Sequence, residues 1–140
     1  MTIGEAVGRV MHDRPSEANE SELRMWLWQL DLRFWHEQVL RHEGGDQVEE
    51  PAYDAETPAD TVLLIHPPYD EAYIHHLYAC IDYRLGEMDR YNNDAIMFRD
   101  AWKDACKAYR RTHMPLETRL HHVVYGRRPR REAEEDASEG

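Results

Sequence analysis

Histidine, cysteine and carboxylate side chains are the groups in this chain that could hold a metal ion. The chain has nine histidines, and Glu71 and His75 stand four residues apart, where a helix would place them on one face as half of a site. The HExxH motif of zinc hydrolases is absent, because His36-Glu37 is followed by histidine only at His42. A structural zinc ion needs four ligands in a closed shell. We therefore predict no metal site.

Motifs for covalent or nucleotide chemistry are also missing. None of the seven glycines belongs to a GxSxG elbow, a phosphate-binding loop or a dinucleotide fingerprint. Paired carboxylates such as Glu49-Glu50 fall in a segment rich in charge, where solvated ions are expected rather than a catalytic acid and base. We predict no catalytic residue, no cofactor and no cofactor-binding residue, and hence a protein that is not an enzyme.

Size and charge narrow the class of protein further. The 140 residues suffice for one domain, and a net charge of −11 disfavours binding to the phosphate backbone of nucleic acids. An arginine-rich run at 127–131 could bind nucleic acid or an acidic partner, but the acids at 132–136 can neutralise it. Two cysteines without framework spacing are typical of reduced thiols in a cytoplasm. We expect neither a signal peptide nor a membrane-spanning segment.

Apolar residues at helical spacing predict four helices. The first follows a capping box formed by Thr2 and Glu5 and ends before Pro15. The other three are expected over about residues 20–43, 69–85 and 87–111. Gly86 would end the third helix, so the third and fourth should form a hairpin. The predicted fold class is all-α, a small bundle of about four helices.

The second predicted helix has apolar residues on two nearly opposite faces. One face consists of Leu23, Leu27, Leu30 and Phe34, and the other of Met25, Trp28, Leu32, Trp35 and Val39. Since one bundle can cover only one face fully, we expect the face with Trp28 and Trp35 to contact a neighbouring subunit or another protein. The predicted interface residues are Trp28, Leu32, Trp35 and Val39, with the aliphatic run Val62, Leu63, Leu64 and Ile65.

Residues 44–68 form a long extended loop that we call the arm. Its four prolines and two glycines exclude a helix and leave room for at most a short strand at 61–65. No Lys or Arg occurs between His42 and Tyr83, and the acidic residues assigned to the arm are Asp46, Glu49, Glu50, Asp54, Glu56 and Asp60. Because these charges repel each other, we expect the arm to be mobile in the isolated protein and ordered only in an assembly.

Several motifs in the chain resemble a family of small structural proteins of tailed phages and prophages. They are Trp28, Leu30 and Asp31; His42-Glu43-Gly44; Pro67-Pro68-Tyr69-Asp70 with Tyr73-Ile74; Ile81-Asp82-Tyr83 with Gly86-Glu87; Tyr91-Asn92-Asn93; and Arg111-Thr112-His113-Met114-Pro115. In this order, over about residues 20–115, the chain looks like a head-tail connector, or neck adaptor. The resemblance implies a mostly helical subunit of a ring beneath the portal, with no cofactor and no catalytic residue to carry over.

The same resemblance implies the partners and the location. The partners would be copies of the chain in a ring, the portal protein, and tail or neck proteins, in the neck of a virion assembled in the host cytoplasm. DNA would pass nearby without specific binding, kept from adhering by acidic residues, and no membrane would be involved. The helical adaptor domain would span residues 1–125, with a short element at 116–125, and residues 126–140 would form a charged, disordered tail.

Two other interpretations stay open from the sequence. The first is a small acidic intracellular binding module, such as an inhibitor of a nucleic-acid enzyme. The second is a metal-dependent hydrolase, for which Glu71 and His75 would be the starting point.

Overall fold

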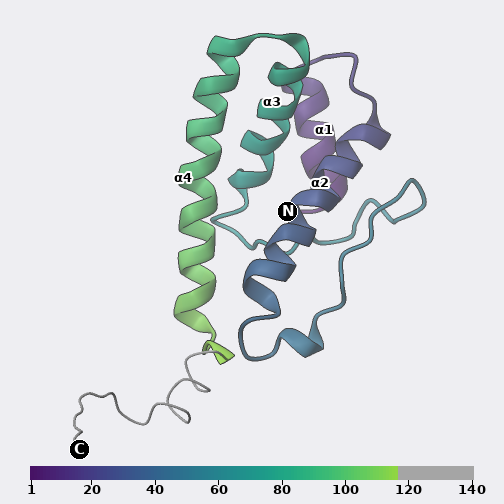
Figure 1. Ribbon diagram of the computed structural model, residues 1–140. Helices are drawn as coiled ribbons and strands as arrows, with labels where there is room; N and C mark the ends of the chain where they lie inside the picture. Colours follow the sequence, from purple (N-terminus) through teal and green to yellow (C-terminus); the bar gives the residue numbers. More distant parts are fainter. Residues whose placement is uncertain (117–140) are drawn as a thin grey trace, which may run out of the picture.

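The computed structural model describes residues 1–116, which form four α-helices joined by turns and one long loop (Figure 1). The helices are α1 (Ile3–Asp13), α2 (Glu20–Phe34), α3 (Glu71–Leu85) and α4 (Met88–Thr112). A π-helical turn, η1 (Trp35–Val39), continues α2, and a 3₁₀ turn, η2 (Gly45–Gln47), follows it. Since residues 1–116 contain no named strand, the predicted all-α bundle is confirmed.

Side-chain caps start the first two helices. The Thr2 hydroxyl accepts a hydrogen bond from the Glu5 N–H, and the Glu5 carboxylate accepts one from the Thr2 N–H, which confirms the predicted capping box. Asn19 and Glu22 form the same arrangement at the start of α2. Each box satisfies two N–H groups that the helix itself leaves without partners, so both starting points are fixed locally.

The second helix ends earlier than the sequence pattern predicts. The pattern extends one helix to Glu43, but the helical stretch changes to the π-helical η1 at Trp35 and stops at Val39. Gly44 then has a φ of 85°, which glycine adopts without strain. A Cβ on Gly45 would stand 2.0 Å from the Val39 carbonyl oxygen, so the chain can fold back onto the helix end only with glycine there.

The predicted hairpin of α3 and α4 is confirmed, and the two helices pack along each other (Figure 1). Gly86 at the turn has a φ of 76° and donates its N–H to the Tyr83 carbonyl. α3 starts at Glu71, two residues later than predicted. α4 has 25 residues, about 37 Å at 1.5 Å per residue, and only part of its length lies against α3.

The hydrophobic core lies between α1, α2 and α3, and α4 closes it from one side. Its largest fully buried apolar and aromatic side chains are Ile3, Val10, Leu23, Leu27, Phe34, Leu63, Tyr73, Ile74, Leu77 and Ile81. The predicted inner face of α2 is therefore in the core. The Phe34 ring meets Trp102 and Tyr109 edge-on, at centroid distances of 5.8 and 5.4 Å, and these contacts join α2 to the C-terminal half of α4.

A cluster of charges joins the end of α1 to the hairpin. Arg14 Nη1 donates to the carboxylate of Asp82, which is fully buried, and to that of Asp94 at 2.8 Å. Arg90 adds a longer contact of 3.3 Å to Asp82, and the Arg14 guanidinium lies over the Tyr78 ring at 4.0 Å. One guanidinium thus balances two buried carboxylates from two helices.

The prediction of a mobile arm is wrong, because residues 44–68 pack on the chain's own helices. Leu63 and Ile65 are buried in the core. Three backbone hydrogen bonds join the arm to residues 1–4, among them the Leu63 N–H to the Met1 carbonyl at 3.0 Å. Apolar burial and paired backbone groups offset the entropy of ordering the loop, so no second subunit is needed to hold it.

Three further expectations concern the remaining parts of the chain. The short strand at 61–65 is reduced to one isolated bridge, between Thr2 and Val62. No helix among residues 1–116 is both long enough and apolar enough to cross a bilayer. The predicted short element after Leu116, the domain boundary at 125 and the charged tail at 126–140 lie outside the described residues.

Candidate functional site

The arm covers the second apolar face of α2. Trp28 Nε1 donates a hydrogen bond to the Pro51 carbonyl at 2.8 Å, and Trp35 Nε1 donates one to the Val48 carbonyl at 3.2 Å. Both indoles are only partly exposed, and Val39 is buried in the core. The expectation of a second subunit on this face therefore loses its physical basis, because the missing cover is supplied by the same chain.

The remaining predicted interface residues are divided between the core and the surface. Leu63 and Ile65 are buried, while Leu32 and Leu64 are half-buried. Val62 is 61% exposed and is the most exposed residue of the aliphatic run. These residues do not form one continuous surface.

Arg24 on α2 fixes the middle of the arm, and the sequence pattern did not indicate this role. Its side chain is nearly fully buried, and Nη1 donates to the carbonyl oxygens of Asp54 at 2.8 Å and Thr57 at 2.7 Å. Its Nε bonds to the Glu20 carboxylate at 3.0 Å. The partners of Nη1 are main-chain groups, which every residue carries, so no residue type in the arm indicates where Arg24 binds.

Asp31 on α2 holds the other half of the arm. Its buried carboxylate accepts hydrogen bonds from the Tyr53 hydroxyl at 2.6 Å, from the Leu64 N–H at 3.0 Å and from the Tyr73 hydroxyl. The Tyr73 oxygen accepts the Ile65 N–H at 2.7 Å. Burial raises the pKa of Asp31, and the hydrogen bonds oppose this shift. We call Asp31, Tyr53 and Tyr73 the Asp31 network; it positions two of the predicted site residues.

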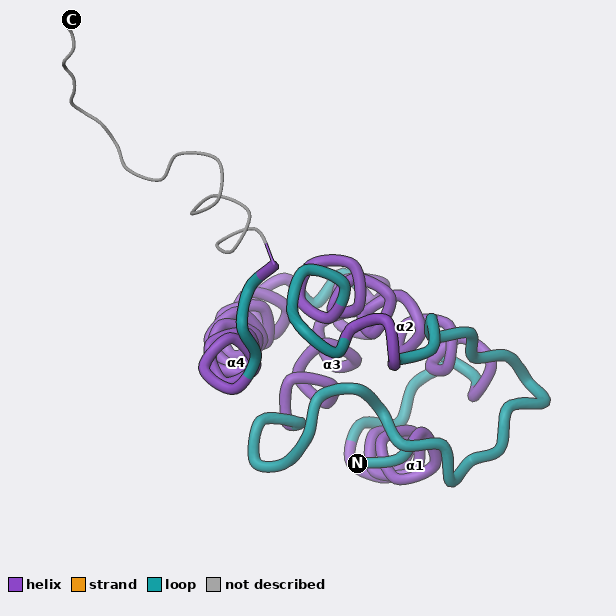
Figure 2. The backbone as a smooth tube through the Cα atoms, turned by 90° about the horizontal axis from the view of Figure 1, so that it is seen from below, coloured by secondary structure: helices purple, strands orange, loops and turns teal. Residues whose placement is uncertain are grey.

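The acidic residues of the arm form a fixed array at the surface. All six are exposed: Asp46, Glu49, Glu50, Asp54, Glu56 and Asp60. The Asp54 carboxylate accepts the Glu56 N–H at 2.8 Å and the Thr57 hydroxyl at 3.2 Å, and these bonds lower the pKa of Asp54. The two views of the backbone show that the arm bulges on the side of the molecule opposite α4 (Figures 1 and 2).

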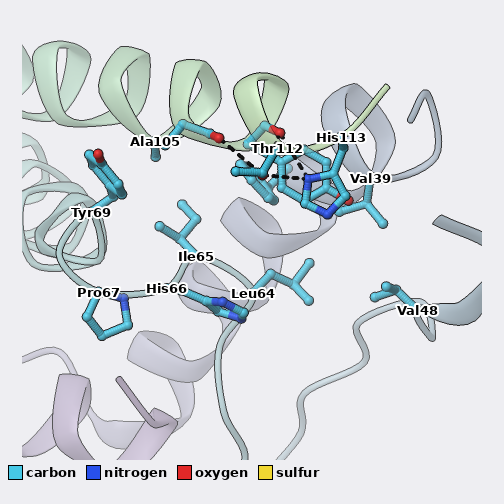
Figure 3. Close-up of a pocket in the computed structure, with 13 residues that line it drawn as sticks. Val39, Val48, Leu64, Ile65, His66, Pro67, Tyr69, Ala105, Thr112 and His113 are labelled. Atoms are coloured by element: carbon cyan, nitrogen blue, oxygen red, sulfur yellow. Dashed lines mark hydrogen bonds between the residues drawn. The ribbon is translucent and has the colours of Figure 1, made fainter. Parts of the chain in front are cut away.

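A pocket of about 390 Å³ lies between the C-terminal half of α4 and the arm (Figure 3). Its apolar lining consists of Phe34, Val39, Val48, Leu64, Ile65, Pro67, Ala105, Ala108 and Tyr109, and its polar lining of His66, Tyr69, Thr112 and His113. Three predicted interface residues, Val39, Leu64 and Ile65, thus meet in one wall. The sequence pattern did not identify the residues of α4 as pocket residues, because their spacing indicates only a helix face that packs in a bundle.

The polar groups of the pocket are ordered near the end of α4. The His113 ring stacks on Tyr109 with a centroid distance of 3.9 Å and an interplanar angle of 5°, and its Nδ1 lies 2.9 Å from the Tyr109 carbonyl oxygen. The Thr112 hydroxyl donates to the same carbonyl at 3.1 Å. A mostly apolar pocket with a few polar groups in its lining is suited to burying an apolar side chain or ligand.

Glu71 and His75 do not act as half of a metal site. The Glu71 carboxylate forms two hydrogen bonds, of 2.7 and 2.8 Å, with the Arg9 guanidinium, and this ion pair lowers the pKa of Glu71. Within residues 1–116, no group of three or more His, Cys, Asp and Glu side chains is placed to hold a metal ion. No observation in this region favours the hydrolase interpretation.

His76 and Cys80 lie one turn apart on α3, with Sγ 3.8 Å from Nε2. Burial lowers the pKa of His76 to about 4 and raises the pKa of the Cys80 thiol to about 11. At neutral pH both groups are uncharged, and an un-ionised thiol is a weak nucleophile. Cys80 and Cys106 are both free, which confirms the expected thiols.

Acid is expected to destabilise the fold through His76. A histidine whose pKa is lower in the folded than in the unfolded chain contributes stability above the unfolded pKa of about 6.5, and this stability is lost as the pH falls toward 4. By pH 4.5 the loss should be about 2–3 kcal/mol, at 1.36 kcal/mol per pKa unit. Denaturant unfolding between pH 7 and 4.5 measures it. His76→Phe, which keeps an aromatic ring beside Phe98, should remove this part of the pH dependence; an unchanged acid loss would assign it to other groups.

Apolar side chains are also exposed at the turn between α3 and α4. Tyr83, Leu85 and Met88, which we call the hairpin tip, are 65%, 50% and 47% exposed. The Tyr83 ring lies 5.2 Å from that of Tyr91, at the start of α4. The sequence pattern did not single out the hairpin tip, because glycine at a helix end explains the turn without reference to a surface.

Comparison with known proteins found no matching family model, no similar curated protein and no similar solved structure. The candidate sites therefore stand on the geometry of the chain alone: the acidic array of the arm, the pocket beside α4 and the hairpin tip.

Proposed function

We propose that this protein is a structural subunit of a tailed phage or prophage, a head-tail connector that assembles as a ring between the portal and the tail. The observation that carries the proposal is the hairpin tip. Three large side chains, those of Tyr83, Leu85 and Met88, are exposed within six residues at the turn between α3 and α4, while the core of the described domain is already filled. Exposed apolar groups gathered at one place are typical of protein–protein interfaces.

The acidic array supports a position next to the DNA passageway. Its six carboxylates are carried by a main chain that Arg24, Trp28, Trp35 and the Asp31 network hold in place. A surface of this charge repels the phosphate backbone of DNA over a distance of about 8–10 Å at physiological salt. The bulge of the arm lies on the side of the molecule opposite α4, so this side could face a channel while the hairpin contacts other subunits (Figure 2).

Coexpression with the portal protein of the same genome tests the proposal. We expect the two proteins to copurify as stacked rings in electron micrographs, with the arm directed toward the channel and no specific binding of DNA. Tyr83→Asp should weaken the complex and leave the helical circular dichroism unchanged. If the portal protein does not bind under any of these conditions, or if no portal, capsid or tail gene flanks the gene, the proposal is wrong.

The acidic array also favours a second candidate function, inhibition of a nucleic-acid enzyme by occupying its DNA-binding surface. Carboxylates on a rigid main chain can replace phosphates at a basic cleft. This candidate predicts that neutralising Glu49, Glu50 and Glu56 to glutamine abolishes partner binding. The connector function predicts the opposite: Tyr83→Asp should weaken binding to the portal protein more than the glutamine substitutions do.

A further inference from the structure

The hairpin tip and the pocket occupy opposite ends of the same helix. The tip includes Met88 at the first residue of α4, while the pocket is lined by Ala105, Ala108 and Thr112 near its last residue. The 24 steps between Met88 and Thr112 correspond to about 36 Å along a straight helix axis. The hairpin tip and the pocket thus lie at the two ends of one helix, which is the long green ribbon in Figure 1.

The charges around the two ends are complementary. Glu87 and Asp89 flank the hairpin tip, are exposed, and form no ion pair among residues 1–116. Arg110 and Arg111, which lie between the pocket residues Tyr109 and Thr112 in the sequence of α4, are likewise exposed and without an ion pair in the described part of the chain. The cations that are closest to the tip in sequence are already used, since Arg84 pairs with Glu22 and Arg90 with Asp82.

We infer that the hairpin tip of one copy of this protein docks in the pocket of the next copy, with Glu87 and Asp89 facing Arg110 and Arg111. This inference rests on the proposed ring and names its subunit contact. A second copy is the occupant because one chain carries both complementary surfaces, at places too far apart to meet within itself. Such a head-to-tail contact uses different patches on the two partners and builds rings or open filaments, whereas a two-fold contact stops at a dimer.

The pocket has room for the side chains that the contact requires. A volume of about 390 Å³ falls within the range of about 300–1,000 Å³ of pockets that bury most of a bound molecule. Leu85 and Met88, the aliphatic members of the hairpin tip, would replace water against Leu64, Ala108 and Tyr109, which line the pocket and are half-buried. The paired charges at the edge then orient the tip and exclude the reversed arrangement.

Variants of the full-length chain test the contact by light scattering after size exclusion. Leu85→Asp places a charge in the hairpin tip, and Ala108→Trp fills the pocket. Each substitution should lower the association constant at least tenfold and so reduce the average number of subunits per assembly. Met11→Asp, at an exposed apolar residue of α1, is the matched control and should assemble as the wild type does. Circular dichroism confirms that each variant folds. The decisive sample mixes the two defective variants, which keep one working surface each and should form dimers and nothing larger.

A charge exchange tests the orientation without altering the pocket. Two double variants reverse the charges on one side of the contact each: Glu87→Arg with Asp89→Arg, and Arg110→Glu with Arg111→Glu. Each double variant should impair assembly, and a chain that carries all four substitutions should recover it.

If either the tip variant or the pocket variant assembles as the wild type does, or if the mixture of the two forms long oligomers, the proposed contact is wrong while the connector function stands. Loss of portal binding by Ala108→Trp with intact rings would assign the pocket to the portal and also overturn the contact. A wild-type chain that stays monomeric alone and on the portal would overturn the ring as well.

Discussion

Replacing Asp31 by alanine is expected to lower the free energy of unfolding by about 4–6 kcal/mol, because each buried donor left without a partner costs about 1–3 kcal/mol. Three donors would be affected: the hydroxyls of Tyr53 and Tyr73 and the N–H of Leu64. Chemical denaturation followed by circular dichroism at pH 7 measures the change. A loss of this size is a large part of the total stability of a domain of this length.

Asp31→Asn and Tyr53→Phe serve as graded controls for the alanine variant. Asparagine keeps one oxygen, which in the place of Oδ2 can accept from Leu64 and Tyr53, so its cost should be clearly smaller than that of alanine. Tyr53→Phe removes one hydrogen bond from the carboxylate, at about 1–2 kcal/mol. Hydrogen exchange of the Leu64 and Ile65 amides should accelerate in the order Tyr53→Phe, Asp31→Asn, Asp31→Ala. Equal stability of the alanine and asparagine variants would show that the Asp31 network is not what holds the arm.

Replacing Arg14 by methionine should cost about 3–5 kcal/mol at pH 7, the usual cost of removing one partner from a buried ion pair. The substitution leaves the carboxylates of Asp82 and Asp94 close together with no guanidinium between them. Arg90→Met is the matched control, because Arg90 reaches Asp82 at a longer distance with a side chain that is 56% exposed, and its loss should cost less than about 1 kcal/mol.

The pH dependence of the Arg14→Met variant provides a second measure of the same cluster. Burial and the neighbouring Asp82 raise the pKa of Asp94, and Arg14 acts against that shift, so its removal should raise the pKa of Asp94 further. A carboxyl group with a raised folded pKa contributes stability at low pH and loses it as the pH rises through that pKa. The stability deficit of Arg14→Met relative to the wild type should therefore shrink between pH 7 and 4.5. A deficit that stays constant over this range would mean that lost packing on Tyr78, not charge, explains the cost.

The helices could be predicted from the sequence because their signals are local. The capping box at Thr2, the apolar spacing of α3 and α4, and Gly86 at the turn each depend on residues within a few positions of one another. The hairpin followed from the short connection between two helices. Val39, Leu64 and Ile65 were predicted as interface residues; in the structure they line a pocket, and Val39 and Ile65 are buried in the core.

The position of the arm could not be predicted, because the contacts that determine it are not encoded in side-chain types. Arg24, Trp28 and Trp35 donate to main-chain carbonyls of the arm, and Asp31 accepts a main-chain N–H. The composition of the arm predicts a solvated loop whose acidic residues repel each other, because composition carries no information about these main-chain contacts. The π-helical turn was also missed, and so was the close return of Gly45 onto the Val39 carbonyl at the end of that turn.

Attachment of the arm through its main chain has a consequence for how this protein can diversify. Arg24, Trp28 and Trp35 donate hydrogen bonds to the main-chain carbonyl oxygens of residues 48, 51, 54 and 57. Every amino acid carries such a carbonyl, so these bonds do not depend on the side chain at those positions. Substitutions of Glu49, Glu50 or Glu56 are therefore expected to leave the main-chain path of the arm unchanged, while they change the charge and polarity of its surface. A lineage could change the sign of this surface in a few steps without passing through an unfolded intermediate, and a combinatorial library at these positions would retain its fold.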